Sequence, residues 1–192
     1  FHTIVSIKND GHYFCRAGGN RPDGLNEPVT LKTTSDRYQS FVKQEVLIPT
    51  EGAEVDYRLI FESILQLRQR VKIVQCPIDP YGATSLRHML EEEGLEPVEI
   101  RQNFTNMSDP MREIEAALAS GRFHHDGNPI MNWCIQNVIG RYLPGSDDIV
   151  RPGKEGKQNK IDGAVGLLMG IGRAMLNSTV SKSAYDEEDI TC

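Results

Sequence analysis

The order of strand and helix patterns along the chain most constrains its fold. Residues Phe1 to Ile7 are apolar or β-branched at nearly every position, and Asp10-Gly11 is a hairpin turn signal before a return strand from His12 to Cys15. Beyond Asp56, helical and strand patterns alternate. An antiparallel hairpin followed by strand–helix–strand units predicts an α/β domain with a mixed sheet flanked by helices.

The other elements are predicted from periodicity, capping residues and chain breakers. The predicted helices span residues 37–43, 57–70, 84–93, 108–121, 128–138 and 161–176. The predicted strands span residues 46–48, 71–78 and 98–101. Residues 16–30 and 140–159 are expected to be loops, because glycine, proline and polar residues dominate both segments.

Length and charge limit the classes of protein to consider. A chain of 192 residues suits one domain, predicted here to cover residues 1–177. The remaining residues, 178–192, hold four acids near their end and predict an acidic, disordered tail. No apolar run approaches the roughly 20 residues that a membrane span needs, so no membrane contact is expected. The net charge of −6 argues against a surface coated with basic charge for nucleic acid.

The four cysteines do not indicate a zinc site. None of them forms a CxxC pair, and no histidine lies at ligand spacing from any of them. Cys76 falls in an apolar strand pattern and Cys134 in a helical one. Both are expected to be buried, reduced thiols, which is typical of a cytosolic compartment.

Two aspartates occupy positions where catalytic carboxylates are found. Asp79 ends an apolar run of strand length, and catalytic groups gather at the carboxyl ends of strands in open α/β sheets. Asp162 begins a helix that is otherwise apolar. Each has a structural alternative: Asp79 as a helix-capping residue, and Asp162 as a first-turn acid favoured by the helix dipole.

Taken together, the two acids indicate a site for hard cations. Mg²⁺ and Mn²⁺ are held by carboxylates and substrate phosphate oxygens, and two such ions about 4 Å apart support phosphodiester cleavage. Such a site usually needs three or more acids, whereas two are well placed here. Four cations are candidates for DNA phosphate contacts, with a solvated loop as the alternative: Arg151, Lys154, Lys157 and Lys160.

Other conspicuous residues are expected to have structural roles. His124-His125 precedes Asp126-Gly127 in a predicted turn and is expected to be an exposed pair without a metal. Trp133 is expected to lie in the core, and Asp56 is expected to cap the helix that follows it.

Several segments, in order, resemble the large subunit of tailed-phage terminases. The resemblance covers residues 1–177. Its clearest parts are like the family's "DPYNAT" and "RIDGIVAL" motifs. The matching segments are Val55-Asp56-Tyr57, Ile78-Asp79-Pro80-Tyr81-Gly82-Ala83-Thr84, Leu90-Glu91-Glu92-Glu93-Gly94, Val98-Glu99-Ile100-Arg101-Gln102, residues 108–115, residues 121–129, Trp133 and Lys160-Ile161-Asp162-Gly163-Ala164-Val165.

This resemblance implies an RNase H-like nuclease domain that needs Mg²⁺ or Mn²⁺. In the family, an Asp on the first strand, the Asp of the "DPY" segment and the Asp of the closing helix hold metal, and the last two match Asp79 and Asp162. The first-strand Asp has no counterpart, and the chain is expected to begin just after it, without that N-terminal strand. Some relatives place a further ligand where this chain has Asn159, which is at best a weak ligand. No P-loop occurs in this chain, so the family's ATPase domain is not expected within it.

The resemblance also implies a biological setting. The domain is expected to cut concatemeric double-stranded DNA in the host cytoplasm during phage assembly. Its expected partners are the terminase small subunit, the portal protein and the ATPase domain. One alternative is a module that, in this truncated form, docks on the portal or motor and cuts nothing. Another is a different RNase H-like enzyme, such as a resolvase or transposase, which the long match disfavours.

Overall fold

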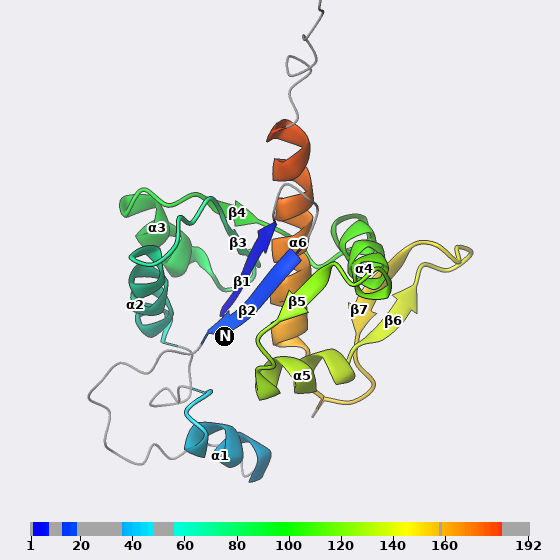
Figure 1. Ribbon diagram of the computed structural model, residues 1–192, viewed down its shortest axis with the longest axis horizontal. Coiled ribbons are helices and arrows are strands. Elements are labelled where there is room, and N and C mark those ends of the chain that lie inside the picture. The colour runs from blue at the N-terminus through cyan, green and yellow to red at the C-terminus, as the bar shows by residue number, and fades with distance from the viewer. Residues whose placement is uncertain (1, 8–12, 19–35, 48–55, 158, 182–192) are drawn as a thin grey trace, which may run out of the picture.

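A computed structural model describes residues 2–7, 13–18, 36–47, 56–157 and 159–181. These residues form a mixed α/β fold of helices and small sheets around a central helix, α6 (Figure 1). In chain order the elements are β1 (His2–Ile7), β2 (Tyr13–Gly18), α1 (Asp36–Lys43), α2 (Tyr57–Arg68), β3 (Cys76–Ile78), α3 (Thr84–Glu92), β4 (Pro97–Glu99), α4 (Phe104–Ala119), β5 (Phe123–His125), α5 (Pro129–Gln136), β6 (Ile139–Tyr142), β7 (Val150–Gly153) and α6 (Asp162–Ser181).

The strands of the described part form three small sheets instead of the single mixed sheet that the sequence predicts. β2 lies between β1, to which it is antiparallel, and β5, to which it is parallel. β3 and β4 form a parallel pair, and β6 and β7 an antiparallel hairpin. The mixed character is therefore confirmed in the first sheet, but β3 has β4 as its one described neighbour and is not a central strand.

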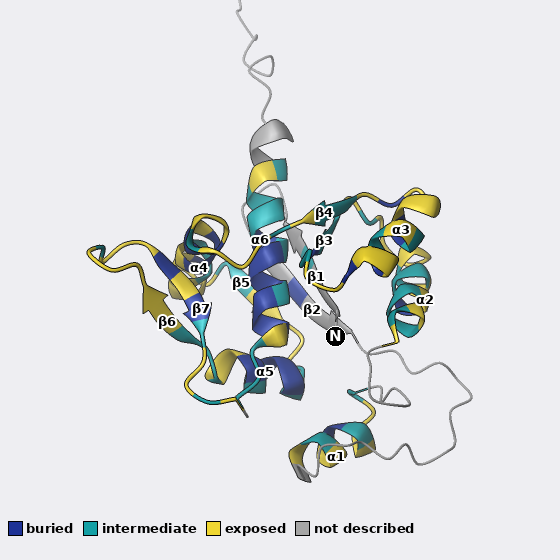
Figure 2. Cartoon of the chain, turned by 180° about the vertical axis from the view of Figure 1, so that it is seen from behind, coloured by how far each residue is buried: buried dark blue, intermediate teal, exposed yellow. Residues whose placement is uncertain are grey.

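The core is built around α6, whose middle turns are buried on most sides (Figure 2). Leu167 and Ile171 belong to a cluster with residues of β2, α4 and α5. Gly170 lets β1 approach the helix closely, because a β-carbon at that position would lie 2.7 Å from Val5 Cγ2. The strong apolar pattern of the last predicted helix is explained by this central position.

Several local predictions are confirmed. The hairpin of β1 and β2 forms with the expected antiparallel pairing, and α1, α3 and α5 fall within a few residues of their predicted ranges. Asp56 caps α2, since its Oδ1 accepts the backbone N–H of Arg58 at 2.9 Å. Gly94 follows α3 with a φ of 71°, a left-handed conformation that favours glycine. The hairpin turn at residues 8–11 lies outside the described residues, as does most of the predicted loop 16–30.

The predicted start of α4 is wrong. This helix begins at Phe104, because Asn103 is its N-cap and accepts the backbone N–H of Asn106 at 2.9 Å. Pro110, the third residue of the predicted helix 108–121, lies well inside the observed helix and is buried. Its ring packs close to Gly172 of α6, so tertiary contact compensates a residue that ordinarily ends helices.

Two predicted strands differ from the structure. Of residues 71–78 only Cys76–Ile78 are in a strand, because the partner β4 is equally short and the backbone N–H of Val71 still bonds Leu67 at the end of α2. Of residues 46–48, Val46 and Leu47 form a bend whose backbone N–H groups donate to Phe41, and Ile48 lies outside the described residues.

Two predicted irregular segments contain strands. The predicted turn at His124-His125 belongs to β5, which pairs with β2, although both histidines are exposed as expected. The predicted loop 140–159 contains most of β6 and all of β7. Gly140 and Pro152 hide their strand pattern, and Val150 holds the hairpin by donating its N–H to Ser108 Oγ at 3.2 Å.

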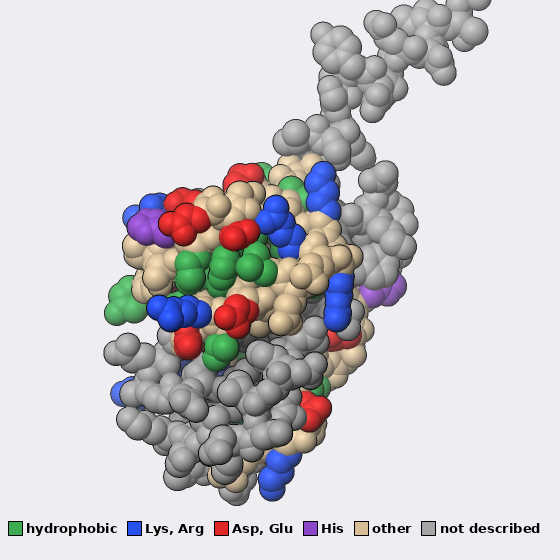
Figure 3. Space-filling model, turned by 90° about the vertical axis from the view of Figure 1, so that its left-hand side faces the viewer, with side chains coloured by type: hydrophobic (Ala, Val, Ile, Leu, Met, Phe, Trp, Pro, Cys, Tyr) green, Lys and Arg blue, Asp and Glu red, His purple; other side chains and the backbone are tan. Residues whose placement is uncertain are grey.

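The predicted division into a domain and a tail remains a prediction. α6 runs through Ser181, past the expected end of the domain at residue 177, and residues 182–192 lie outside the described part. Within the described residues no helix is long and apolar enough to cross a membrane. Figure 3 shows the side that bears α2 and α3, where basic and acidic side chains alternate around hydrophobic ones. This face fits the expectation that the surface is not uniformly basic.

The buried Tyr13 makes the stability sensitive to high pH. Its burial, followed by the charge of Glu113, raises the pKa of Tyr13 to about 12 from 10.0. Folded Tyr13 therefore keeps a proton that the unfolded chain releases, and the free energy of unfolding falls as the pH rises from 10 towards 12. We expect the free energy of unfolding, measured with urea across this pH window, to fall less in Tyr13→Phe than in the native protein. An equal fall in native protein and variant would contradict this, and Tyr142→Phe, at an exposed site, is the control.

Candidate active site

Asp79 lies directly after β3 and is held by donors from two segments. Its Oδ1 accepts the backbone N–H of Tyr81 at 2.9 Å, and its Oδ2 accepts a hydrogen bond from the side-chain amide of Gln102. It does not cap α3, because the N-cap residue of that helix is Ala83, which makes no side-chain capping bond. The half-buried carboxylate is thus fixed at the end of a strand, and the capping alternative is excluded.

Gln102 reaches Asp79 because β3 and β4 run in parallel and end at the same edge. The N–H of Ile100 donates to the carbonyl of Ile78 at 2.8 Å, which aligns the two strand ends. Gln102 follows two residues later and turns its amide to the carboxylate. The sequence contains Gln102 in a matching motif, but this role at Asp79 was not predicted.

Asp162 is the exposed first residue of α6 and lies near α1 and α5. Burial, followed by the charge of Asp162, raises the pKa of Tyr38 in α1. Burial also raises the pKa of Cys134 in α5, with a smaller contribution from Asp162, whereas the backbone N–H groups of Gly163 and Ala164 lower it. As a first-turn acid, Asp162 is favoured by the helix dipole, so its placement fits both readings of this residue.

One packing cluster joins the segment of Gln102, the partner of Asp79, to the segment that carries Asp162. Ile100, close to Gln102, and Ile161, next to Asp162, both pack on the cluster that contains Met107 and Val165. The end of β4 and the start of α6 therefore meet at the same part of the core. Within the described residues, no group of three or more His, Cys, Asp or Glu side chains forms a metal cage.

The predicted phosphate-binding residues lie in different environments. Arg151 is exposed on β7, with its guanidinium 5.1 Å from the ring centroid of Phe104, the first residue of α4. Lys154 and Lys157 are exposed, and Lys160 is half-buried, with its carbonyl accepting the side-chain amide of Asn137 at 3.0 Å. Arg151 is thus the cation whose contacts tie it to the Asp79 side of the site, because Phe104 follows shortly after Gln102.

The hairpin adds a cation that the sequence did not single out. Arg141 on β6 is the cross-strand partner of Arg151, and its Nη2 donates to the carbonyl of Lys154 at 3.3 Å. Only the strand pairing, which the sequence hides, brings these charges together. Asn159, the candidate weak ligand, is half-buried just before α6, and its backbone N–H donates to Gly156 at 3.1 Å.

The other residues considered in the sequence lie at surface or packing positions. His88 is exposed on α3. Trp133 is half-buried and packs at the edge of a cluster around Phe41 instead of lying fully in the core. Cys134 is buried as predicted, whereas Cys76 is only half-buried.

Comparison with known proteins defines the class of this chain. Residues 1–178 match the family described as "Terminase large subunit, endonuclease domain". The chain therefore belongs to this family of phage terminase nuclease domains, as the sequence motifs predicted.

Two curated relatives and one solved structure are similar to it. Protein YmfN of Escherichia coli (strain K12) is 55% identical over 158 residues, which are 82% of this chain and 33% of that protein. The terminase large subunit of Enterobacteria phage HK97 is 26% identical over 163 residues, which are 82% of this chain and 31% of that protein. The crystal structure of the HK97 bacteriophage large terminase shares the fold, with a TM-score of 0.67 and 21% identity, covering 90% of this chain and 36% of the other. The chain thus spans about a third of the length of the curated relatives it matches.

Proposed function

We propose that this domain is a metal-dependent DNA endonuclease on an RNase H-like scaffold, which cuts concatemeric phage DNA for packaging. The observation that carries the proposal is the match of residues 1–178 to a terminase endonuclease domain. The geometry supports it, because Asp79 lies at a strand end and Asp162 begins the central helix. One packing cluster also joins the segment of Gln102, the partner of Asp79, to the start of that helix. That matching family is a nuclease family, so the non-catalytic docking module is not favoured.

The candidate residues carry the types of donor atom that a divalent metal prefers. Asp79 and Asp162 offer carboxylate oxygens, and Asn159 offers a neutral oxygen, which are the donors that Mg²⁺ and Mn²⁺ prefer. A two-metal centre would take its further ligands from water, substrate phosphate and another acid. Bound there, the metal ions would lower the pKa of a water and offset charge at the scissile phosphate.

The chain's own residues would orient these ligands and the DNA. Gln102 and the N–H of Tyr81 fix the rotamer of Asp79, as partners of metal-binding carboxylates commonly do. Asp162 stands at the first turn of a long, buried helix, which gives it a rigid base. Arg151, Lys154, Lys157 and Lys160 would contact backbone phosphates, which implies cutting with little base specificity.

The same proposal gives the domain its setting. Double-stranded DNA is its substrate, and the ATPase domain, the terminase small subunit and the portal protein are its partners. Its place of action is the host cytoplasm during phage assembly.

Conversion of supercoiled plasmid to nicked and linear forms tests the proposal. The protein is expected to cut with Mn²⁺ or Mg²⁺, and EDTA is expected to stop the reaction. Cleavage that persists in EDTA would exclude the metal mechanism, and the absence of cleavage with either ion would return the docking module to consideration.

Arg151→Gln is expected to weaken DNA binding uniformly across sequences. Removing one phosphate contact should reduce the slope of log affinity against log salt concentration by about 1. Fluorescence anisotropy with labelled duplexes at several salt concentrations measures this slope. Arg58→Gln on the exposed face of α2 is the control with the same charge change. Equal slopes in the two variants would remove Arg151 from the DNA interface.

A further inference from the structure

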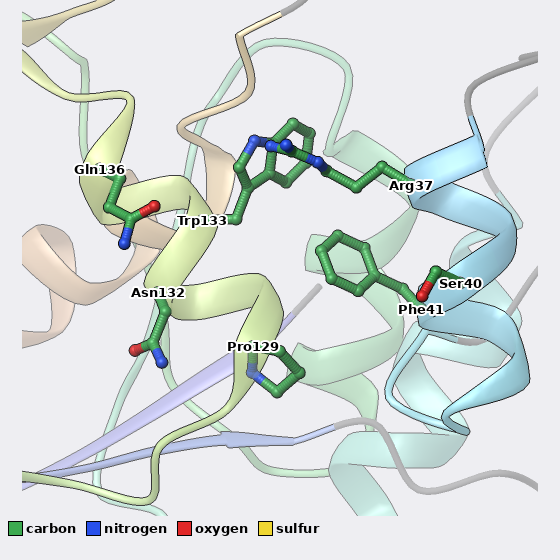
Figure 4. A pocket seen from close by; sticks show the side chains of 7 residues that line it. All are labelled: Arg37, Ser40, Phe41, Pro129, Asn132, Trp133 and Gln136. Atoms are coloured by element: carbon green, nitrogen blue, oxygen red, sulfur yellow. The ribbon is translucent and has the colours of Figure 1, made fainter.

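A groove of about 820 Å³ lies between α1 and α5 and is open to solvent on one side. Aromatic and polar side chains from the two helices face each other across it (Figure 4). Its lining residues are Arg37, Ser40, Phe41, Pro129, Asn132, Trp133 and Gln136. The proposed cleavage chemistry uses none of them.

Trp133 is the centre of a cluster of aromatic rings and one guanidinium at this groove. The guanidinium carbon of Arg37 lies 5.3 Å from the centroid of its ring. Tyr38 meets the indole edge to face, with ring centroids 5.7 Å apart, and Phe41 lies against it with centroids 5.8 Å apart. The indole is therefore held in place by rings on α1, while a planar cation covers it from the open groove.

The polar groups around this stack have spare bonding capacity. Arg37 is exposed and forms no ion pair with a described acid, whereas four other arginines of the described part do. Gln136 is exposed on the next turn of α5 from Trp133. Asn132 uses its amide N–H₂ only in a long contact of 3.4 Å to the Gly127 carbonyl. A cation, a flat aromatic surface and available amides together suit a nucleobase and its phosphate.

The groove borders the start of α6, where Asp162 lies. Phe41 and Cys134 share a buried cluster with Ala164, two residues beyond Asp162. α5 lines the groove with one face and packs on the first turn of α6 with another. A strand in the groove would thus run beside one of the two proposed catalytic acids.

We propose that this groove binds an unpaired stretch of DNA strand next to the cut, with a base stacked on the Arg37 guanidinium that lies over Trp133. The inference rests on the proposed nuclease function and adds a subsite to it. Bases inside a duplex are already stacked, so the groove would select a frayed end or a locally opened strand. An acidic peptide segment is the competing occupant, because Arg37 also suits a carboxylate.

The chain carries its own reporter for this subsite, since Trp133 is its sole tryptophan. A short oligothymidylate of about eight nucleotides, within the site size of strand-binding grooves, is titrated in EDTA, and tryptophan emission is recorded. Saturable quenching is expected. Arg37→Gln should weaken binding about tenfold, in line with the loss of one base-stacking contact. Lys43→Gln, which removes the same charge from α1 outside the groove, should bind as the native protein does.

Each other outcome overturns the inference. The inference is overturned if oligothymidylate does not quench the emission, or if Arg37→Gln and Lys43→Gln have equal effects. It is also overturned if oligoglutamate alone quenches the emission. Quenching by a blunt duplex as strong as by the single strand would contradict the selection of unpaired bases. Because EDTA prevents metal-dependent cleavage, the titration measures binding alone. A negative binding result would therefore refute the subsite and leave the result of the plasmid cleavage assay unchanged. A protein that binds oligothymidylate in the groove but never cuts plasmid would refute the nuclease proposal instead.

Discussion

Asp79→Asn is expected to lower the rate of plasmid cleavage by more than about 100-fold. Mutating a residue that only hydrogen-bonds to a metal ligand typically costs about 10–100-fold in metal affinity or activity, and loss of the ligand itself should cost more. The fold should survive, since the Asn side-chain oxygen can still accept the N–H of Tyr81 that Asp79 accepts. Cleavage rates at saturating Mn²⁺ and the midpoint of thermal unfolding measure the two effects separately.

The matched control is Glu92→Gln, which removes one negative charge from the exposed face of α3. It should cut plasmid at the native rate. If Asp79→Asn also cuts at that rate, Asp79 is a structural residue that orders the turn after β3 and has no part in the chemistry.

Ile171→Ala is expected to lower the free energy of unfolding by about 2–5 kcal/mol, the usual cost of deleting a large buried aliphatic group. Ile171 is fully buried in α6 and shares a cluster with residues of β2, α4 and α5. The cavity would therefore loosen contacts between elements that are far apart in the sequence. Urea unfolding monitored by circular dichroism measures the change.

Leu118→Ala is its control, because this leucine is 56% exposed on α4. Surface truncation of this kind changes stability by no more than about 0.5 kcal/mol. Equal losses for the two variants would mean that α6 is not the centre of the core.

The positions of the two acids could be predicted because they depend on local signals. An apolar run that ends in Asp79-Pro80 marks a strand end, and Asp162 before an apolar stretch marks a helix start. The Asp56 cap follows from the same local chemistry. Whether Asp79 and Asp162 act as ligands stays a prediction.

Features that depend on distant contacts could not be predicted. The β6–β7 hairpin is held by a hydrogen bond between Val150 and Ser108, which are far apart in the chain. Its glycine and proline residues are typical of loops, so the sequence predicted a loop there. Gln102 is ordinary in sequence and gains its role only because β4 aligns with β3. The division of the described strands into three small sheets is likewise set by which strand edges meet, which periodicity does not encode.

The central claim is that Asp79 and Asp162 act together on one metal-dependent cut in DNA. The most direct test compares plasmid cleavage in Mn²⁺ by the native protein, Asp79→Asn, Asp162→Asn and the double variant. Residues that act as a unit are non-additive, so each single variant should lose cleavage and the double variant should be no worse. Native-rate cleavage by Asp162→Asn, or losses that simply multiply in the double variant, would contradict a shared catalytic centre.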